Sequence, residues 1–195
     1  MRVIADVRKH VLTYAISPRF RLEDLEGATF EKLVEIFKDQ MMGWLIEPAN
    51  HLKSQQHAGF AILAIVLSYF EPIGQFLEGK RGDSQKQFAL GLRAVFPDLD
   101  KAEFDALVGE LYQQLRCGMF HRGITREKVV ISPASDHAFA IEMNDKASLG
   151  RIVVTPVNLM QHLEQHLNRY VAQLLDPANV ELRANFLKWF ANRAS

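Results

Sequence analysis

The sequence predicts a mainly α-helical protein: an up-and-down helical bundle forming a single domain over residues 1–195, with a small antiparallel β-sheet inserted at about residues 128–155. Three observations support this fold class. Apolar residues recur at helical spacing over most of the chain, the spacing changes to that of strands in one segment, and no repeat, linker or low-complexity stretch divides the chain. A length of 195 residues also fits one domain and leaves little room for two.

The N-terminal half carries strong helical patterns. Residues 3–16 are predicted to form a short helix, and a longer helix is expected to begin after Thr29, a residue type that favours the N-cap position. Pro48 is expected to interrupt this longer helix. The segment 54–70 is apolar on most sides, which predicts a helix at the centre of the bundle, and Pro72 is expected to kink or end it.

Two further helices are predicted before the change of period. The segment 85–95 has a helical pattern and follows a loop rich in glycine and charge. Asp100 and Glu103 have the spacing of a capping box and open the next helix, whose apolar face extends to Leu115. Gly118 is expected to weaken the helix beyond that point, because glycine has a low helix propensity.

The sheet is predicted from three short runs that are β-branched or alternate apolar with polar residues, at 128–132, 137–143 and 151–155. Thr155 followed by Pro156 is a typical helix start, with a capping residue and then proline at the first helical position. Asp176 and Pro177 are expected to begin the last helix, which runs to about Asn192.

Composition and charge limit the classes of function. The formal net charge is zero, so any nucleic-acid binding must come from a local basic patch. The lone cysteine, Cys117, excludes an internal disulfide framework and a cysteine-built zinc site. The first residues lack the apolar core of a signal peptide, and the most apolar run, 58–67, is far shorter than the roughly 20 residues of a membrane span. We therefore expect a cytoplasmic protein that does not contact a membrane.

Two patterns resemble ligand sites. The stretch 74–81 nearly matches a phosphate-binding loop, but arginine replaces the hydroxyl residue and a helix precedes it, so a solvated loop is the favoured interpretation. His162 and His166 share a helix face at a spacing that can hold a divalent metal. No third ligand is evident, so a pair at the surface or at the boundary of the core is favoured, and a metal-binding bundle remains the less favoured alternative.

The clearest candidate site is the pair Arg116 and His121, at the end of a helix with more cations beyond it. A histidine can take a proton from an RNA 2′-hydroxyl or give one to the leaving oxygen. An arginine can bind the phosphate and stabilise the charge that develops on its oxygens, so no metal or other cofactor is required. Arg122, Arg126 and Lys128 would add phosphate contacts that position the strand.

The spacing raises a geometric problem. In a continuous α-helix, two residues five positions apart lie about 140° apart around the axis and do not share a face. Three solutions are open: the helix breaks near Gly118, Arg116 reaches around the helix, or a second subunit completes the site.

The segment "LRCGMFHRG", residues 115–123, follows a helix in a mainly helical chain and resembles the HEPN superfamily (higher eukaryotes and prokaryotes nucleotide-binding). This resemblance implies a small helical bundle, a homodimer with a composite site, and metal-independent endoribonuclease activity in toxin–antitoxin or defence systems. Arg116 would be the phosphate-binding arginine and His121 the catalytic histidine. A small antitoxin-like protein would be a further partner. Cys117 departs from the family pattern, in which a polar residue commonly follows the arginine.

A second hypothesis is a non-catalytic module on the same fold that binds nucleotides or RNA or regulates a protein partner. In this case Arg116 would anchor a helix end or an acidic partner, and His121 would cap free helix carbonyls. The zero net charge and Cys117 favour this alternative. Cys117 itself is expected to be buried, since free cysteine commonly behaves as a small apolar residue.

Overall fold

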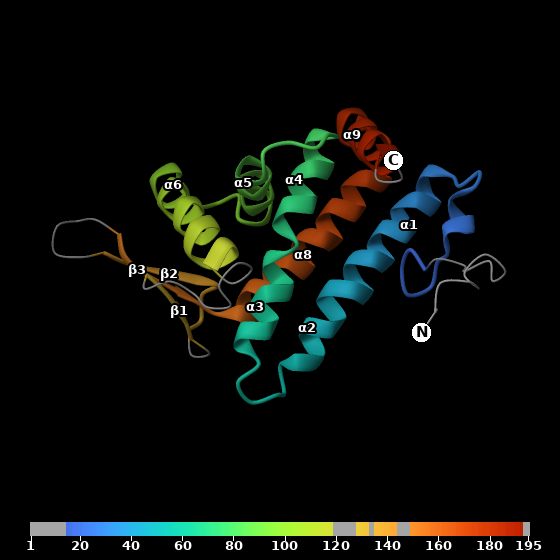
Figure 1. The fold of residues 1–195 in the computed structure, drawn as a ribbon. Helices are drawn as coiled ribbons and strands as arrows, with labels where there is room; N and C mark the ends of the chain where they lie inside the picture. Colours follow the sequence, from blue (N-terminus) through green and yellow to red (C-terminus); the bar gives the residue numbers. More distant parts are fainter. Residues whose placement is uncertain (1–14, 119–127, 133–134, 144–148, 193–195) are drawn as a thin grey trace, which may run out of the picture.

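The computed structural model of the chain describes residues 15–118, 128–132, 135–143 and 149–192, and shows a mainly helical protein with a small sheet at one side (Figure 1). The helical elements, in chain order, are η1 (Leu22–Leu25), α1 (Phe30–Met41), η2 (Met42–Ile46), α2 (Glu47–Leu52), α3 (Gly59–Leu67), α4 (Phe70–Glu78), α5 (Ser84–Val95), α6 (Lys101–Glu110), η3 (Leu111–Arg116), α8 (Pro156–Leu175) and α9 (Val180–Asn192). The strands are β1 (Val129–Ile131), β2 (Phe139–Met143) and β3 (Leu149–Val154). Residues 3–14 of the predicted first helix lie outside the described part of the chain.

The long first helix begins where the sequence predicts but does not stop at Pro48. Thr29 is the N-cap of α1, and its side chain accepts a hydrogen bond from the Lys32 backbone N–H. The predicted interruption at Pro48 is wrong, because helical backbone continues through η2 and α2 to Leu52. The π turn η2 precedes the proline, and the proline sits in the first turn of α2, where a missing N–H costs little.

The apolar segment predicted at 54–70 forms a shorter helix. Helix α3 starts at Gly59, after a turn over residues 53–58, and ends at Leu67. The helix is interrupted at Ser68 and Tyr69, and α4 then begins at Phe70 with Pro72 in its first turn. Proline has no N–H to offer the carbonyl four residues earlier, which here is that of Ser68, so the break lies where the proline disrupts the helical bonds.

Helices α5 and α6 begin at side-chain caps. Asp83 accepts a hydrogen bond from the Lys86 N–H at 2.9 Å. Asp100, the predicted cap, accepts one from the Glu103 N–H at 2.8 Å. After α6 the helical backbone continues without a break through η3 to residue 118. Helices α5 and α6 therefore lie in the segments where the sequence predicts them.

The sheet is mixed, which corrects the prediction of an antiparallel sheet. Its strand order is β1-β3-β2, with β3 antiparallel to β2 and parallel to β1. Strand β3 takes the central position and buries Ile152 and Val154. Alternation along a strand shows which face is buried but not which strand will be its neighbour, so the parallel pairing was not visible in the pattern.

Helix α8 is the centre of the bundle, with α1 and α3 packed against it (Figure 1). The aromatic core beside it joins Phe37 of α1, Phe76 of α4 and Phe186 of α9, whose rings contact one another. Helix α8 starts at Pro156, as predicted, but the Thr155 side chain forms no capping bond. The Thr155 hydroxyl oxygen is buried and has no hydrogen-bond partner among the described residues.

One stretch of the described chain, Gly59–Glu78, is long and apolar enough to cross a membrane by length and composition, with a mean hydropathy of 1.7. Half of its apolar window is buried inside the protein. Core helices of folded domains share these properties, so the stretch is weak evidence for a membrane span and agrees with a central helix pair.

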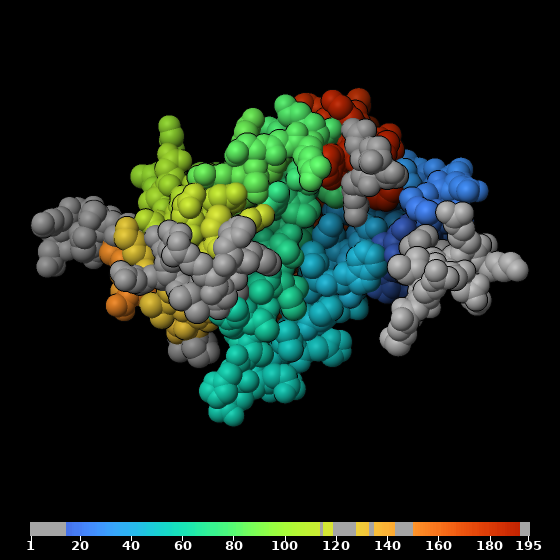
Figure 2. All heavy atoms as spheres, in the orientation of Figure 1, coloured from blue at the N-terminus to red at the C-terminus, as the bar shows by residue number. Residues whose placement is uncertain are grey.

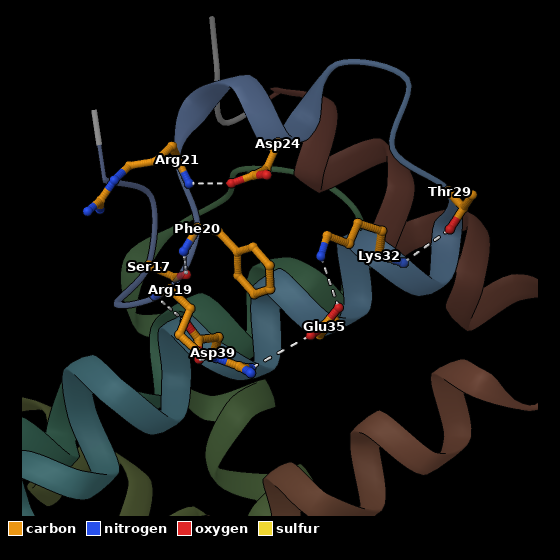
Figure 3. Close-up of polar contacts among 9 residues, drawn as sticks. All are labelled: Ser17, Arg19, Phe20, Arg21, Asp24, Thr29, Lys32, Glu35 and Asp39. Carbon is orange, nitrogen blue, oxygen red and sulfur yellow. Dashed lines mark hydrogen bonds and ion pairs between the residues drawn. The ribbon is translucent and has the colours of Figure 1, made fainter. Parts of the chain in front are cut away.

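The segment before α1 is held to that helix by a polar network (Figure 3). The Arg19 backbone N–H donates to Asp39 Oδ2 at 3.0 Å, and the Arg19 Nε donates to Asp39 Oδ1 at 2.6 Å. Burial acts to raise the pKa of Asp39, but hydrogen bonds from Ser17 and Arg19 outweigh it, and the pKa is lower than the ordinary value. Asp39 is therefore the acceptor that joins this segment to α1.

Replacing Asp39 by alanine is expected to loosen the contact of Arg19 with α1. Without the carboxylate, the Arg19 amide loses its acceptor and should exchange its hydrogen about fivefold faster, the effect of one lost hydrogen bond. Hydrogen–deuterium exchange followed at the Arg19 amide measures this. The matched control is Glu35→Ala, because Glu35 lies 3.8 Å from the Arg19 guanidinium and both side chains are exposed. Equal exchange rates in both variants would contradict the assignment.

Candidate functional site

Arg116 is the last residue of η3 and is held by an ion pair to α4. Its Nη2 lies 3.0 Å from Glu71 Oε2, and the side chains are 28% and 26% exposed, respectively. The same Glu71 oxygen accepts a hydrogen bond from the Ser84 hydroxyl at 2.7 Å. Because Glu71 belongs to the first turn of α4 and Ser84 to the first turn of α5, this contact joins three separate elements.

The backbone at Arg116 is a π turn. The Cys117 N–H donates to the Tyr112 carbonyl, five residues earlier, and the Arg116 guanidinium lies 5.7 Å from the centre of the Tyr112 ring. Single π turns within α-helices are often found at functional sites. The turn η2 has the same geometry and carries no candidate residue, so it is the combination of the π turn with the ion pair that distinguishes η3.

A cleft of about 330 Å³ lies beside this ion pair. Leu67 and Pro72 provide its apolar lining, and Ser68, Glu71 and Arg116 provide its polar lining. A guanidinium has five N–H donors in a planar fork, which matches the geometry of a phosphate. The arrangement can therefore accept an anion beside Arg116 with an apolar group against the opposite residues.

Lys128 is near the same region. It precedes β1, which contacts η3, and its Nζ lies 3.0 Å from Glu110 Oε1. The lysine side chain is 46% exposed. Contact between Lys128 and an RNA phosphate stays a prediction. The phosphate would have to compete with the Glu110 carboxylate for the lysine ammonium group.

The other predicted site residues, His121, Arg122 and Arg126, lie outside the described part of the chain. Helical backbone is described as far as Gly118, and the residues beyond it that would show a break lie outside the described part of the chain, so all three solutions to the spacing problem stay open. Gly118 is buried, and the lack of a side chain suits it to that place. Cys117 is half-buried rather than fully buried.

His162 and His166 have different environments. The His162 ring lies against Phe96, with the ring centres 4.9 Å apart, and burial together with the positive charge of Arg169 lowers its pKa. His166 is 5% exposed, and its Nδ1 lies 2.9 Å from the Tyr69 hydroxyl oxygen. Among the residues that the structure describes, no group of three or more His, Cys, Asp or Glu side chains could hold a metal ion.

The stretch resembling a phosphate-binding loop is not one. Gly74–Glu78 is the second half of α4, and Gly79 ends that helix in the left-handed conformation, with φ of 67°. A loop between a strand and a helix, which the motif requires, is absent from this described segment. The rejection of the motif is confirmed.

Two residues of the site, Glu71 and Ser84, were not found from the sequence. Glu71 stands as a lone acid within an apolar helical stretch, and a charge in such a position needs a partner. That pattern could have identified Glu71 as a paired residue. It could not have identified Arg116 as the partner, because the two are 45 positions apart.

Comparison with known proteins does not assign the chain to a class. No family model, no curated protein and no solved structure among those compared matches it. The chemistry of the Arg116 cleft is therefore the basis for assigning a function.

Proposed function

We propose that the chain is a HEPN-like, metal-independent endoribonuclease that acts as a homodimer, with Arg116 and His121 as its catalytic residues. The observation that supports the proposal is the position of Arg116: half-buried, held by Glu71 and lining a cleft. An arginine oriented in this way is suited to bind the scissile phosphate, because little side-chain freedom is lost on binding.

The reaction proposed here is transfer of the phosphoryl group within the RNA chain. His121 accepts the proton of the 2′-hydroxyl, and the 2′-oxygen attacks the adjacent phosphorus. The bond from phosphorus to the 5′-oxygen breaks, and that oxygen leaves with the proton that His121 has accepted. A 2′,3′-cyclic phosphate and a 5′-hydroxyl result. Arg116 stabilises the negative charge that develops on the phosphoryl oxygens.

Glu71 has a positioning role in this proposal. Its carboxylate orients the guanidinium and is itself held by the Ser84 hydroxyl. The Glu71→Gln substitution keeps a hydrogen-bond acceptor and removes the charge, so it should alter the orientation of Arg116 less than deletion of the arginine. We expect this variant to keep most of its activity.

Cleavage of mixed RNA by the purified full chain in EDTA tests the proposal. Arg116→Ala is expected to lower kcat/KM about a hundredfold, the effect of removing one donor that stabilises transition-state charge. His121→Ala is expected to have an effect of at least similar size. Arg151→Ala is the matched control, because Arg151 is an arginine on β3 with a 54% exposed side chain. If neither the wild type nor any variant cleaved RNA, or if all of them cleaved it equally, the proposed ribonuclease activity would be refuted.

A second candidate function is a non-catalytic module that binds RNA or regulates a protein partner. The Arg116–Glu71 ion pair also supports this function, since it ties the end of η3 to α4 as a structural anchor would. Under this alternative, Arg116→Ala and Glu71→Gln should lower the melting temperature by similar amounts, and neither should change any RNA cleavage. Measuring melting temperature beside cleavage therefore separates the two functions.

The proposed homodimer and antitoxin-like partner have separate tests. Light scattering of the purified chain gives its mass in solution, and a mass of one chain at working concentration would contradict a composite site. Co-expression with a small protein encoded beside it tests the toxin interpretation, because an antitoxin should suppress RNA cleavage. A cytoplasmic location is part of the same proposal, because RNA substrates are present there.

A further inference from the structure

A second hollow, which we call the α3 groove, lies at the opposite end of α3 from Arg116. It has a volume of about 550 Å³ and lies between the 53–58 turn, the first turn of α3, the end of β1 and the start of α8. The turn projects from the body of the molecule, in teal in Figure 2. Sites for small organic ligands commonly enclose roughly 300–1,000 Å³, so the groove has the size of such a site.

The inner part of the groove is apolar. Ile62, Ile131, Pro156 and Val157 line it, and none of these side chains is exposed. Phe60 stands at its edge with 38% of its surface exposed. An apolar ligand group of several carbons would pack against these side chains and cover the exposed part of Phe60, which favours binding through the hydrophobic effect.

The outer part of the groove is polar and carries one sign of charge. Gln55, Gln56 and Lys53 lie on the turn, and all are exposed. Lys53 is the only Lys, Arg, Asp or Glu among the described residues that line the groove, and no described residue forms an ion pair with it. The groove therefore pairs an apolar interior with a cationic opening, which is complementary to an amphipathic anion.

The sequence at residues 57–59 is unfavourable for the stability of the turn and of the start of α3. His57 has a positive φ of 66°, a conformation rare for a residue with a side chain. Ala58 occupies the N-cap of α3 and provides no side-chain cap, and Gly59 occupies the first helical position. Departures from local preference are expected where a protein retains a functional site.

Gly59 has a direct effect on the groove. A Cβ atom placed there would lie 3.4 Å from the Ile131 Cγ2 and 3.8 Å from the Pro156 Cγ, which is ordinary contact. A side chain is therefore sterically possible, but it would project among the residues that line the groove. Glycine at this position costs helix stability and leaves the groove open.

We propose that the α3 groove is a binding site for a small amphipathic organic anion, with its apolar body against Ile131, Pro156 and Val157 and its anionic head beside Lys53. The first N–H groups of α3, which precede the first intrahelical bond from Ile62 to Ala58, lie at the positive end of the helix and favour the same charge. This site does not depend on the ribonuclease proposal.

Titration of the full chain with 8-anilinonaphthalene-1-sulfonate, an amphipathic anion with environment-sensitive fluorescence, tests the proposal. We expect saturable binding of one dye per chain, displaced by decanoate and not by decyltrimethylammonium. Lys53→Gln should raise the Kd of the dye about fivefold, the effect of losing one exposed charge contact. Gly59→Leu should raise it at least about tenfold, because the new side chain occupies the groove.

Two matched variants serve as controls. Lys101→Gln removes an exposed lysine on α6, and Gly109→Leu adds a side chain to a helical glycine with no atom within 4 Å of the position of its Cβ. Neither should change the Kd, and melting curves of all four variants establish that each is folded. Dye binding that does not saturate, equal displacement by the cation, or an unchanged Kd in folded Gly59→Leu would overturn the proposal. A change from dimer to monomer in Gly59→Leu would overturn it too, because the groove would then be a subunit interface.

Discussion

Gly91→Ala is expected to lower the free energy of unfolding by about 3 kcal/mol, the upper range for overpacking a core. Helices α4 and α5 pack closely, and a Cβ on Gly91 would overlap the backbone carbonyl of Phe70. On the same helix pair, a Cβ on Gly74 would overlap the backbone carbonyl of Gln87. A backbone carbonyl cannot rotate away as a side chain can, so the two helices must separate to accommodate a methyl group.

Urea unfolding at pH 7 measures this effect, with the midpoint expected to fall and the slope to stay constant. Gly109→Ala is the matched control, because Gly109 lies in α6 and a Cβ there would meet nothing within 4 Å. That substitution should instead stabilise the protein by up to about 1 kcal/mol through helix propensity. If the Gly91 and Gly109 variants were equally stable, the close packing of α4 on α5 would be refuted.

Acidification from pH 6.5 to pH 4 is expected to cost about 3 kcal/mol of stability through His166 alone. Burial, with a smaller contribution from the positive charge of Arg169, lowers the pKa of His166 to about 4. The ring is 5% exposed, lies 2.9 Å from the Tyr69 hydroxyl oxygen and stacks on Tyr170. A charged imidazole in this place would be poorly solvated.

The direction of the effect follows from the two pKa values. In the unfolded chain a histidine has a pKa near 6.5, so between pH 6.5 and about 4 the unfolded state binds the proton and the folded state does not. The stability that neutral His166 provides is complete above pH 6.5 and is lost as the pH falls through about 4.

Urea unfolding of the wild type and of His166→Gln across this pH range measures the contribution. Glutamine retains a hydrogen-bond acceptor for Tyr69 but does not titrate, so the difference in free energy of unfolding between the two proteins should shrink as the pH falls. His51→Gln is the control, because His51 is exposed. A difference independent of pH would show that His166 does not titrate over this range.

Elements defined by contacts within a few residues were predictable from the sequence. The caps at Thr29 and Asp100 each bind an N–H three residues ahead, and the strand segments follow from alternation and β-branching. Pro48 was interpreted wrongly because the effect of a proline depends on whether the preceding turn can widen, and here a π turn precedes it. The resemblance of residues 115–123 to the HEPN superfamily is still a prediction.

The candidate site could be predicted only in part. Arg116 was visible through its spacing from His121 and its place at a helix end, but its partners Glu71 and Ser84 lie on two other helices. The α3 groove combines residues from the 53–58 turn, β1 and α8, which no local pattern connects. Both features arise from packing between elements.

The sequence by itself determined which segments form helices and strands and which cation–histidine spacing to consider, because these properties depend on neighbours a few residues apart. Only the tertiary structure decided that β1 lies parallel to β3, that Glu71 holds Arg116, and that glycines bring α4 close to α5. Many helices and strands in this chain have similar apolar faces, so the pattern of apolar residues does not determine which element packs against which. That choice depends on how the shapes of whole elements fit together. The same packing places Ser84 beside Glu71 and so determines how Arg116 faces its cleft.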